Sequence, residues 1–221
     1  MLYEVVMYAR FLKRPLDFLL ALASVVILSP LYLALTGIGA IMMKGNPFFT
    51  QERPGRREKI FRLVKFRTMT NGRGPDGKLL PDAERLNGYG RFLRASSLDE
   101  LPELFNILAG QMALVGPRPL LVQYLPWYTE EEKHRHDVRP GLTGLAQVRG
   151  RNRIGWDERL AYDVEYVRNI TFTGDLRIVL ETFRKVFTRE DLAVDTDTAE
   201  TYLDEERKER RGAQDDQGIH A

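Results

Sequence analysis

The longest apolar stretch of the chain runs from residue 18 to residue 43, 26 positions without a charged side chain. A straight helix of that length would reach about 39 Å, more than the roughly 30 Å hydrocarbon core of a bilayer. Ser29 and Pro30 lie near its middle, and a proline inside a helix removes a backbone hydrogen bond and clashes with the preceding turn. Basic residues flank both ends of the stretch. Because such residues usually stay on the cytoplasmic side, both ends are expected on the same side of the membrane. The pattern predicts a re-entrant helix–break–helix that enters the membrane, bends at Ser29 and Pro30 and returns.

Two alternative roles for this apolar stretch stay open. It could cross the bilayer once, as a straight span, because its length suffices. It could also be the core of a cleavable signal peptide, although such cores usually contain about 7 to 15 apolar residues. The basic residues on both sides favour the re-entrant form, because a single span would place one basic flank on the far side of the membrane.

The rest of the chain mixes short strand patterns with amphipathic helix patterns. Apolar runs on either side of a Pro-Gly turn predict two strands, at 48–51 and 60–66. Helical spacing predicts helices at 83–93, 97–108, 156–169 and 176–187, and a further short strand is predicted at 145–148. Residues 120–128 suit either the core or an interfacial helix, and 71–81 has the composition of a loop. We therefore expect an α/β, mainly helical fold: a re-entrant membrane hairpin plus a compact cytoplasmic domain with interfacial helices and a small β-hairpin.

The expected organisation has three parts. Residues 1–44 form the interfacial segment and the membrane hairpin, 45–190 form the cytoplasmic domain, and 191–221 form a charged tail. Residues 196–221 contain eight acidic and four basic side chains with few apolar ones, a composition that cannot bury much surface. We expect this tail to be flexible.

Charge is distributed unevenly, although the net charge of the 221-residue chain is only +2. Residues 44–67 contain eight Lys or Arg side chains against two acidic ones. Such a basic block beside a membrane segment indicates a surface that faces lipid headgroups or other phosphates. The chain has no cysteine, which excludes a disulfide scaffold, a thiolate metal site and a cysteine nucleophile.

The string SLDELPELFN at 97–106 carries the strongest candidate chemistry. Ser97 followed three residues later by Glu100 predicts a capping box, and Asp99 suits the first turn of a helix. A helix N-terminus also favours phosphate and keeps a nearby carboxylate ionised. An ionised Asp99 could attack phosphorus and form an acyl phosphate, and Glu100 could share a divalent cation with substrate phosphates.

Several cations could accompany these carboxylates. Arg118 lies between two prolines, which would hold its guanidinium ready for a phosphate. Lys65, Arg94 and Arg151 are further candidates, each of which is equally typical of a solvated surface. His134 and His136 are two residues apart in a predicted helix and therefore face different ways, so no metal site is expected there.

Six strings, in order between about residue 10 and residue 190, together resemble the bacterial sugar transferase family, the small monotopic polyprenyl-phosphate phosphoglycosyl transferases. They are Lys13-Arg14-Pro15-Leu16-Asp17, Ser29-Pro30, Lys65-Phe66-Arg67-Thr68-Met69, Asp99-Glu100-Leu101-Pro102, Gly116-Pro117-Arg118-Pro119 and Arg139-Pro140-Gly141-Leu142-Thr143-Gly144. One such string is a weak signal, whereas six in the family's order are specific.

The resemblance implies an enzyme that moves a phosphosugar from a nucleotide diphosphate sugar, usually a UDP-sugar, to undecaprenyl phosphate and releases UMP. Such a reaction is the first membrane step of glycoconjugate or exopolysaccharide assembly. The resemblance also implies a monotopic location on the cytoplasmic face of the bacterial inner membrane, in contact with phospholipid. Nucleic acid is not an expected partner, and a homodimer is left open.

The resemblance further assigns roles to individual residues. It implies that Asp99 is the nucleophile that carries a covalent phosphosugar and that Glu100 helps to hold Mg²⁺. It implies that phosphate is bound by cationic side chains: Arg118 and Arg94, with Lys65 and Arg151 as weaker candidates. It also carries over the helix break at Ser29-Pro30.

Two further functions would use the same features. A non-catalytic adaptor could bind anionic lipid or nucleic acid through the basic block at 44–67, but that gives no reason for Asp99 and Glu100 to accompany a Pro-Arg-Pro loop. A metal-dependent pyrophosphatase acting on nucleotide sugars would need the same residues and no lipid acceptor.

Overall fold

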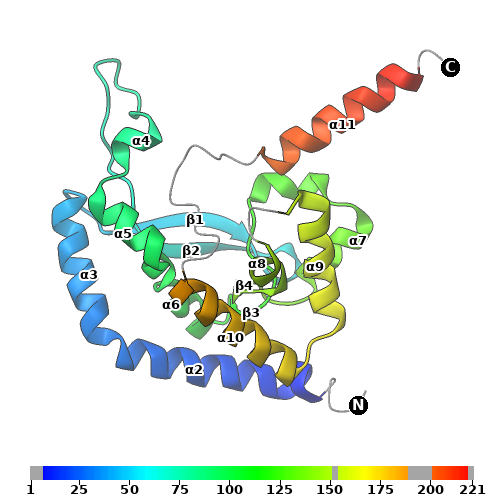
Figure 1. Cartoon of the computed structure of the whole chain (residues 1–221), viewed down its shortest axis with the longest axis horizontal. Helices are drawn as coiled ribbons and strands as arrows, with labels where there is room; N and C mark the ends of the chain where they lie inside the picture. The colour runs from blue at the N-terminus through cyan, green and yellow to red at the C-terminus, as the bar shows by residue number, and fades with distance from the viewer. Residues whose placement is uncertain (1–6, 151–153, 189–200, 219–221) are drawn as a thin grey trace.

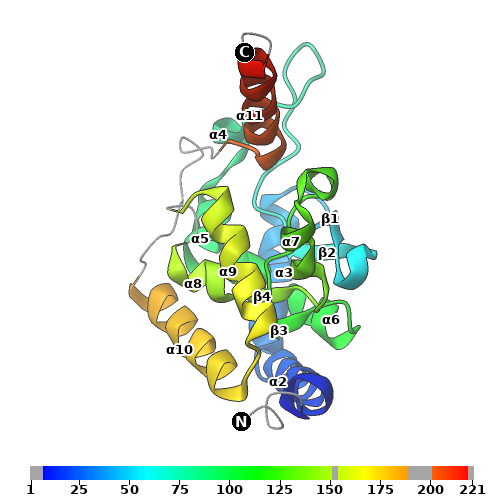
Figure 2. The ribbon, with the colours of Figure 1, turned by 90° about the vertical axis from the view of Figure 1, so that its right-hand side faces the viewer.

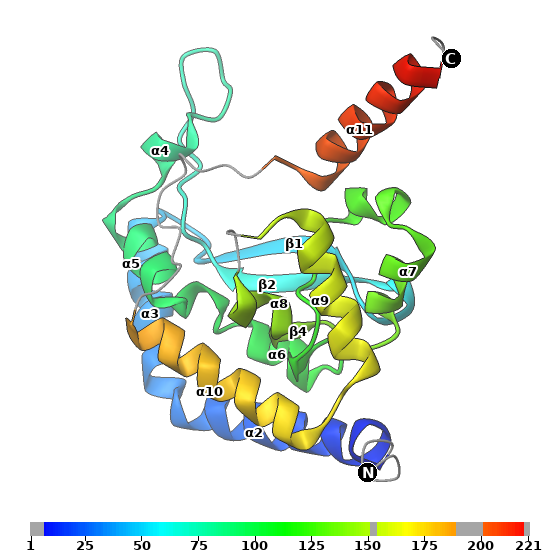
Figure 3. The ribbon, with the colours of Figure 1, turned by 45° about the vertical axis from the view of Figure 1, so that its right-hand side comes forward.

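The chain is mostly helical and contains a small two-stranded antiparallel sheet (Figure 1), as the sequence predicted. The structure is a computed structural model, and it describes residues 7–150, 154–188 and 201–218. The helices α2 and α3 lie along one side of the molecule, and the sheet and the remaining helices lie on their inner side (Figures 1 and 3).

The apolar stretch forms two helices that meet at a bend. A π-helical turn, Tyr8–Leu12, leads into α2 (Lys13–Ile27), and α3 (Ser29–Met42) follows at an angle of 64°. Pro30 stands in the first turn of α3, where no intrahelical N–H bond is needed. The Ser29 hydroxyl donates to the Val26 carbonyl at 2.8 Å, which satisfies an acceptor freed by the break. The structure therefore has a bend at the position of Ser29 and Pro30, and the location of this bend in a membrane stays a prediction.

Neither helix alone has the length and apolar composition to cross a bilayer, and no other single helix in the described ranges does. The turn at Tyr8–Leu12, α2 and α3 meet those criteria only when taken together as a bent pair.

The predicted hairpin is present. Strand β1 (Phe48–Pro54) pairs with β2 (Ile60–Phe66) in antiparallel register, with Phe48 opposite Phe66 and Pro54 opposite Ile60. The connecting turn places Arg57 in the left-handed region, at φ 55°. Phe61 and Leu63 are buried on one face of β2, whereas Phe66 is buried on the other face, so both faces of the hairpin pack against the core.

A second pair of strands was not predicted. Strands β3 (Ala113–Val115) and β4 (Gly141–Thr143) pair in parallel, and the sequence pattern predicted no strand at either place. A Cβ at Gly141 would clash with the Gly116 nitrogen, so only glycine permits this close approach. The strand predicted at 145–148 is wrong: these residues belong to helix α8 (Leu145–Arg149), because so short an apolar run does not distinguish a strand from a helical turn.

The single helix predicted at 97–108 is also wrong. Helix α5 (Gly88–Ser96) ends at Ser97, which adopts a left-handed conformation, and a 3-10 turn, Leu98–Glu100, follows. Helix α6 (Glu103–Leu108) begins after Pro102, which lacks the N–H that a continuous helix would need. The Ser97 side chain makes no capping bond, so the predicted capping box is absent.

The C-terminal part of the described chain is helical, and α10 (Phe172–Thr188) runs beside α2 (Figures 1 and 3). Helices α9 (Trp156–Arg168) and α10 confirm two predictions, with α10 starting earlier than expected. Shorter helices are α4 (Asp82–Arg85) and α7 (Glu130–Lys133), and a 3-10 segment spans Val122–Trp127. Where a flexible tail was expected, the structure has helix α11 (Leu203–Gly218), whose Leu203 is fully buried. Much of α11 projects away from the body (Figures 1 and 2).

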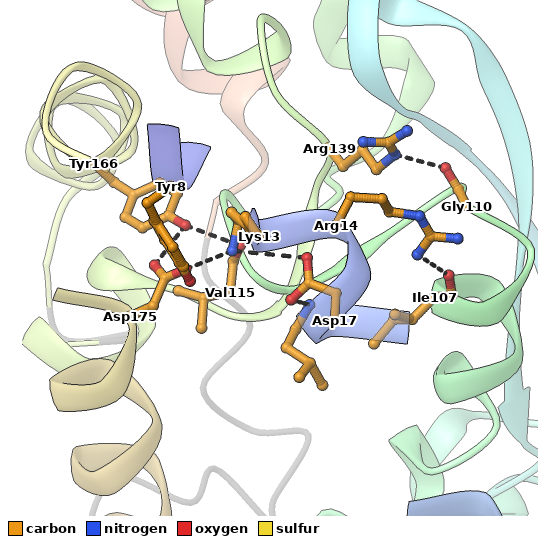
Figure 4. Close-up of polar contacts among 11 residues, drawn as sticks. Tyr8, Lys13, Arg14, Asp17, Ile107, Gly110, Val115, Arg139, Tyr166 and Asp175 are labelled. Carbon is orange, nitrogen blue, oxygen red and sulfur yellow. Dashed lines mark hydrogen bonds and ion pairs between the residues drawn. The ribbon is translucent and has the colours of Figure 1, made fainter. Parts of the chain in front are cut away.

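A buried polar network joins the start of α2 to α10 (Figure 4). Asp175 accepts hydrogen bonds from Lys13 at 2.6 Å, from Tyr8 at 2.7 Å and from Tyr166 at 2.8 Å. Asp17 lies 3.8 Å from the same ammonium and accepts from the Leu114 backbone. These side chains are nearly inaccessible, so the network fixes the helix pair to the rest of the fold.

Candidate active site

The segments that carry the predicted site residues meet at one cavity of about 880 Å³. Its lining contains five of the six candidate side chains: Lys65 of β2, Arg94 of α5, Asp99 and Glu100 of the 98–100 turn, and Arg118 of the loop after β3. The sixth, Arg151, lies outside the described residues.

Hydrogen bonds from neighbouring elements position the turn that carries Asp99 and Glu100. The Tyr32 hydroxyl on α3 donates to the Leu101 carbonyl, which ties this turn to the bent helix pair. The Asn106 amide of α6 accepts from the Val64 nitrogen at 3.1 Å and donates to the Arg62 carbonyl at 2.8 Å. The turn is therefore tied to α3 before Pro102 and, through Asn106, to the β2 backbone after it.

Glu100 is held between two cations. Lys65 Nζ donates to Glu100 Oε1 at 2.7 Å, and Arg118 Nη2 donates to the same oxygen at 2.6 Å. Burial alone would raise the pKa of Glu100, but the charges of Arg118 and Lys65 outweigh it and hold that pKa well below its usual range. Glu100 is therefore ionised throughout the physiological range.

Asp99 differs from its neighbour. No other side chain of the described chain donates a hydrogen bond to its carboxylate, which lines the cavity. Burial and the adjacent negative charge of Glu100 raise the pKa of Asp99 to about 6, against the lowering effect of Lys65 and Arg118. The carboxylate is mostly ionised at neutral pH and is more basic than an ordinary aspartate.

Glu103 is a member of this cluster that sequence reasoning missed. It is only 2% exposed, and its Oε1 lies 3.0 Å from Lys65 Nζ. Burial and the charge of Glu100 raise the pKa of Glu103 to about 7. Glu103 stands three residues after Glu100, a spacing that could have suggested a shared partner, but Lys65 comes from a distant strand that only folding brings near.

Arg118 presents its guanidinium from a rigid loop. Its side chain is 42% exposed, so one edge remains open to a ligand while Nη2 pairs with Glu100. The Arg118 carbonyl accepts from Arg135 Nη2 at 2.7 Å, and Arg135 is itself held by Asp163 at the same distance in a buried ion pair. The loop conformation is thus fixed by the hydrogen bond from Arg135 as well as by its two prolines.

Further cations line the same cavity. Arg94 Nε donates to the Thr68 hydroxyl at 3.2 Å, and this contact aligns the guanidinium with the chain that follows β2. Four arginines that the sequence analysis did not select also contribute: Arg53, Arg67, Arg85 and Arg159. Of these four, only Arg67 stands in one of the six strings, and the four positions are scattered along the sequence, so only the folded chain brings them together. The cavity is suited to a ligand with several negative charges.

The donor set fits Mg²⁺ as a partial site. Among the described residues no group of three or more His, Asp or Glu side chains could hold a metal ion alone. Mg²⁺, however, is usually bound through one or two carboxylates, with substrate phosphates and waters completing its shell. Asp99 and Glu100 are adjacent on one turn and both line the cavity, which matches that requirement.

The sequence match to known proteins spans the elements that build this cavity. Residues 8–189, from the turn before α2 to the end of α10, match the family described as bacterial sugar transferase. The chain belongs to the bacterial sugar transferase family. The prediction of this family, and with it of an enzyme of the phosphoglycosyl transferase class, is confirmed.

Named members of the bacterial sugar transferase family show how far the similarity extends. "Uncharacterized sugar transferase EpsL" of Bacillus subtilis is 49% identical over 184 residues, which cover 81% of this chain and 89% of that protein. "UDP-glucose:undecaprenyl-phosphate glucose-1-phosphate transferase" of Caulobacter vibrioides is 38% identical, with 80% and 70% covered. "Undecaprenyl-phosphate galactose phosphotransferase" of Salmonella typhimurium is 36% identical, and the match covers 82% of this chain but only 42% of that longer protein.

Proposed function

We propose that this bacterial sugar transferase moves a phosphosugar from a UDP-sugar to a polyprenyl phosphate such as undecaprenyl phosphate, and releases UMP. The observation that carries the proposal is Asp99, a carboxylate that receives no side-chain hydrogen bond within the described chain and faces a cavity lined with arginines beside a tightly held Glu100. The names of the Salmonella and Caulobacter relatives support this substrate class.

The reaction we infer has two displacements at one phosphorus atom. A carboxylate oxygen of Asp99 attacks the sugar-bound phosphorus of the donor, the bond from that phosphorus to the bridging oxygen breaks, and UMP leaves with the bonding electrons. An oxygen of the acceptor phosphate then attacks the same phosphorus, and the Asp99 carboxylate departs. The product is a polyprenyl diphosphate sugar, and the two substrates use the site in turn.

The surrounding charges serve this chemistry. Two anionic phosphates must approach an anionic aspartate, so cations are needed to offset the repulsion. Arg118 and Arg94 are our candidates for binding phosphate, and Lys65 keeps Glu100 and Glu103 in place. The raised pKa of Asp99 makes it a better nucleophile than an ordinary carboxylate and leaves it ionised at neutral pH. Mg²⁺, held by Asp99 and Glu100, would neutralise further charge on the phosphates.

We also propose that α2 and α3 enter the membrane and return to the same, cytoplasmic, face. Their outer surfaces expose large apolar side chains, among them Leu19, Ile27, Leu33 and Ile41. Helix α10 exposes a further apolar row: Phe172, Leu176, Leu180 and Phe183. Three to four residues separate its members, so they lie on one helix face that suits a bilayer surface. This arrangement would hold the cavity at the level of the acceptor's phosphate.

The variant Asp99→Asn tests the nucleophile. It should lower UMP release by at least about a thousandfold and abolish the covalent adduct, because the amide is a poor nucleophile. Asp76→Asn is the matched control, since Asp76 lies in the exposed 71–81 loop and its side chain can still accept from the Lys78 nitrogen. Asp76→Asn should keep normal turnover.

The assay uses purified full-length protein with UDP-sugar, Mg²⁺ and undecaprenyl phosphate, and mass spectrometry of the digested protein after donor alone. Near-normal UMP release by Asp99→Asn, or an active wild type with no added mass at residue 99, would overturn the proposed mechanism. UMP and sugar phosphate formed without any acceptor would favour a nucleotide-sugar pyrophosphatase instead.

A further inference from the structure

A second cavity, of about 470 Å³, lies at the far end of the β1–β2 hairpin. It is formed by the connecting turn of the hairpin, by residues 109–111 after α6, and by Arg139. None of its lining residues lines the active-site cavity, so the two are separate.

The lining of the second cavity is cationic. Within the described chain it contains Arg56, Arg57, Lys59 and Arg139 and no acidic side chain. Burial lowers the pKa of Arg139, and the neighbouring positive charges of Arg14 and Arg56 lower it further. Such a cluster is stabilised by a bound anion, and guanidinium groups match the geometry of phosphate oxygens.

Part of the hydrogen-bonding capacity of these cations is available. Arg56 Nε donates to the Asp137 carbonyl, and Arg139 Nε donates to the Gly110 carbonyl. These bonds fix both side chains and leave their terminal nitrogens available to a ligand. Within the described ranges Arg57 and Lys59 have no ion pair or side-chain hydrogen bond. The cavity therefore combines two anchored guanidinium groups with two cations that can close on a ligand.

The position of the cavity indicates where such an anion would come from. Arg14 of α2 donates to the Ile107 carbonyl at 2.7 Å, beside the contact of Arg139 with Gly110 (Figure 4). The cavity thus adjoins the beginning of α2, the helix that we propose enters the membrane. Ile60, another lining residue, is 41% exposed and offers an apolar contact next to the cations.

We propose that this cavity binds the phosphate of an anionic phospholipid headgroup, at the point where α2 meets the bilayer. This inference rests on the proposed membrane insertion of α2 and not on the chemistry at Asp99. A lipid phosphate bound here would fix the depth and tilt of α2 and, through Arg14, of α6.

Calorimetric titration of the full-length protein in a neutral detergent tests this proposal. The probes are dihexanoyl phosphatidylglycerol, dihexanoyl phosphatidylcholine and inorganic phosphate. The wild type should bind the phosphatidylglycerol and should bind the zwitterionic lipid at least about tenfold more weakly. The double variant Arg57→Gln/Lys59→Gln should weaken phosphatidylglycerol binding about tenfold or more, because two charge-assisted contacts are lost.

The control variant Arg149→Gln/Lys208→Gln removes two exposed cations that do not line the cavity and should leave binding unchanged. Equal affinity for inorganic phosphate and phosphatidylglycerol would overturn the lipid assignment in favour of a soluble anion. Unchanged binding in the Arg57→Gln/Lys59→Gln variant would overturn the site itself. Asp99→Asn should bind the lipid normally, so a failure of the proposed catalysis would be distinguishable from a failure of this site.

Discussion

Lowering the pH through about 6 is expected to switch off sugar-phosphate transfer, because Asp99 must be ionised to attack phosphorus. Its pKa is raised to about 6, first by burial and then by the charge of Glu100. A protonated carboxyl group is a poor nucleophile, so kcat/KM should follow the ionised fraction of this residue in the free enzyme.

The size of the effect follows from that pKa. A single group that titrates at about 6 is about nine-tenths ionised at pH 7 and about one-eleventh ionised at pH 5, so kcat/KM should fall about tenfold over this interval. An ordinary aspartate would stay more than about nine-tenths ionised over the same range. Glu103, with a pKa raised to about 7, titrates nearby and could add a second step.

Two variants separate these contributions. Glu103→Gln removes the second titration and should leave an acid limb near pH 6. Glu100→Gln removes a negative charge beside Asp99, which should lower the pKa of Asp99 and move the limb to lower pH, whatever the loss of maximal rate. The assay is UMP release at subsaturating UDP-sugar from pH 4.5 to 8.5. A wild-type profile that is flat down to pH 5, or a limb that moves upward in Glu100→Gln, would refute the reasoning.

Three further predictions concern the scaffold. Asp175→Asn should lower the free energy of unfolding by about 3 kcal/mol, because it leaves the buried Lys13 ammonium without its 2.6 Å partner; an unchanged Tm in detergent would contradict this. Burial lowers the pKa of His136 to about 4, whereas its pKa in the unfolded chain is the ordinary 6.5. Between these values the unfolded chain binds more protons than the folded one, so the free energy of unfolding should fall by about 2 kcal/mol from pH 7 to pH 5. Denaturant melts of wild type and His136→Phe at both pH values measure this, and an equal pH dependence in the two proteins would count against it. Pro30→Ala should straighten the α2–α3 bend toward a single span. Because the chain has no cysteine, cysteines introduced at positions 7 and 46 can be labelled from either side of the membrane, and labelling of both from the same side would disprove the prediction.

The parts of the site that could be predicted are those encoded by neighbours in the chain. Asp99 and Glu100 stand together in one short string, and Arg118 is held between two prolines. The strands at β1 and β2 and the helices α9 and α10 were predicted because a local pattern of apolar residues repeats within each of them. Such patterns need no partner from elsewhere in the chain to be recognised.

The parts that were missed depend on contacts between distant segments. Strands β3 and β4 contain three residues each and are stabilised by pairing with each other, which requires the backbones of Gly116 and Gly141 to lie close together. No local sequence pattern predicts this contact. The docking of α11 depends on Leu203 entering a pocket formed by residues such as Tyr124 and Trp156. Its charged composition alone predicted no order.

The sequence by itself determined the family, the break in the apolar helix and the carboxylate pair, because each depends on residues that are adjacent or evenly spaced in the chain. Only the tertiary structure decided which charges meet. It placed Lys65 between Glu100 and Glu103, left Asp99 without a side-chain donor among the described residues, and gathered arginines from separate elements around one cavity. The physical reason is that ionisation and hydrogen bonding depend on distances of a few ångströms in a desolvated space, and folding sets those distances.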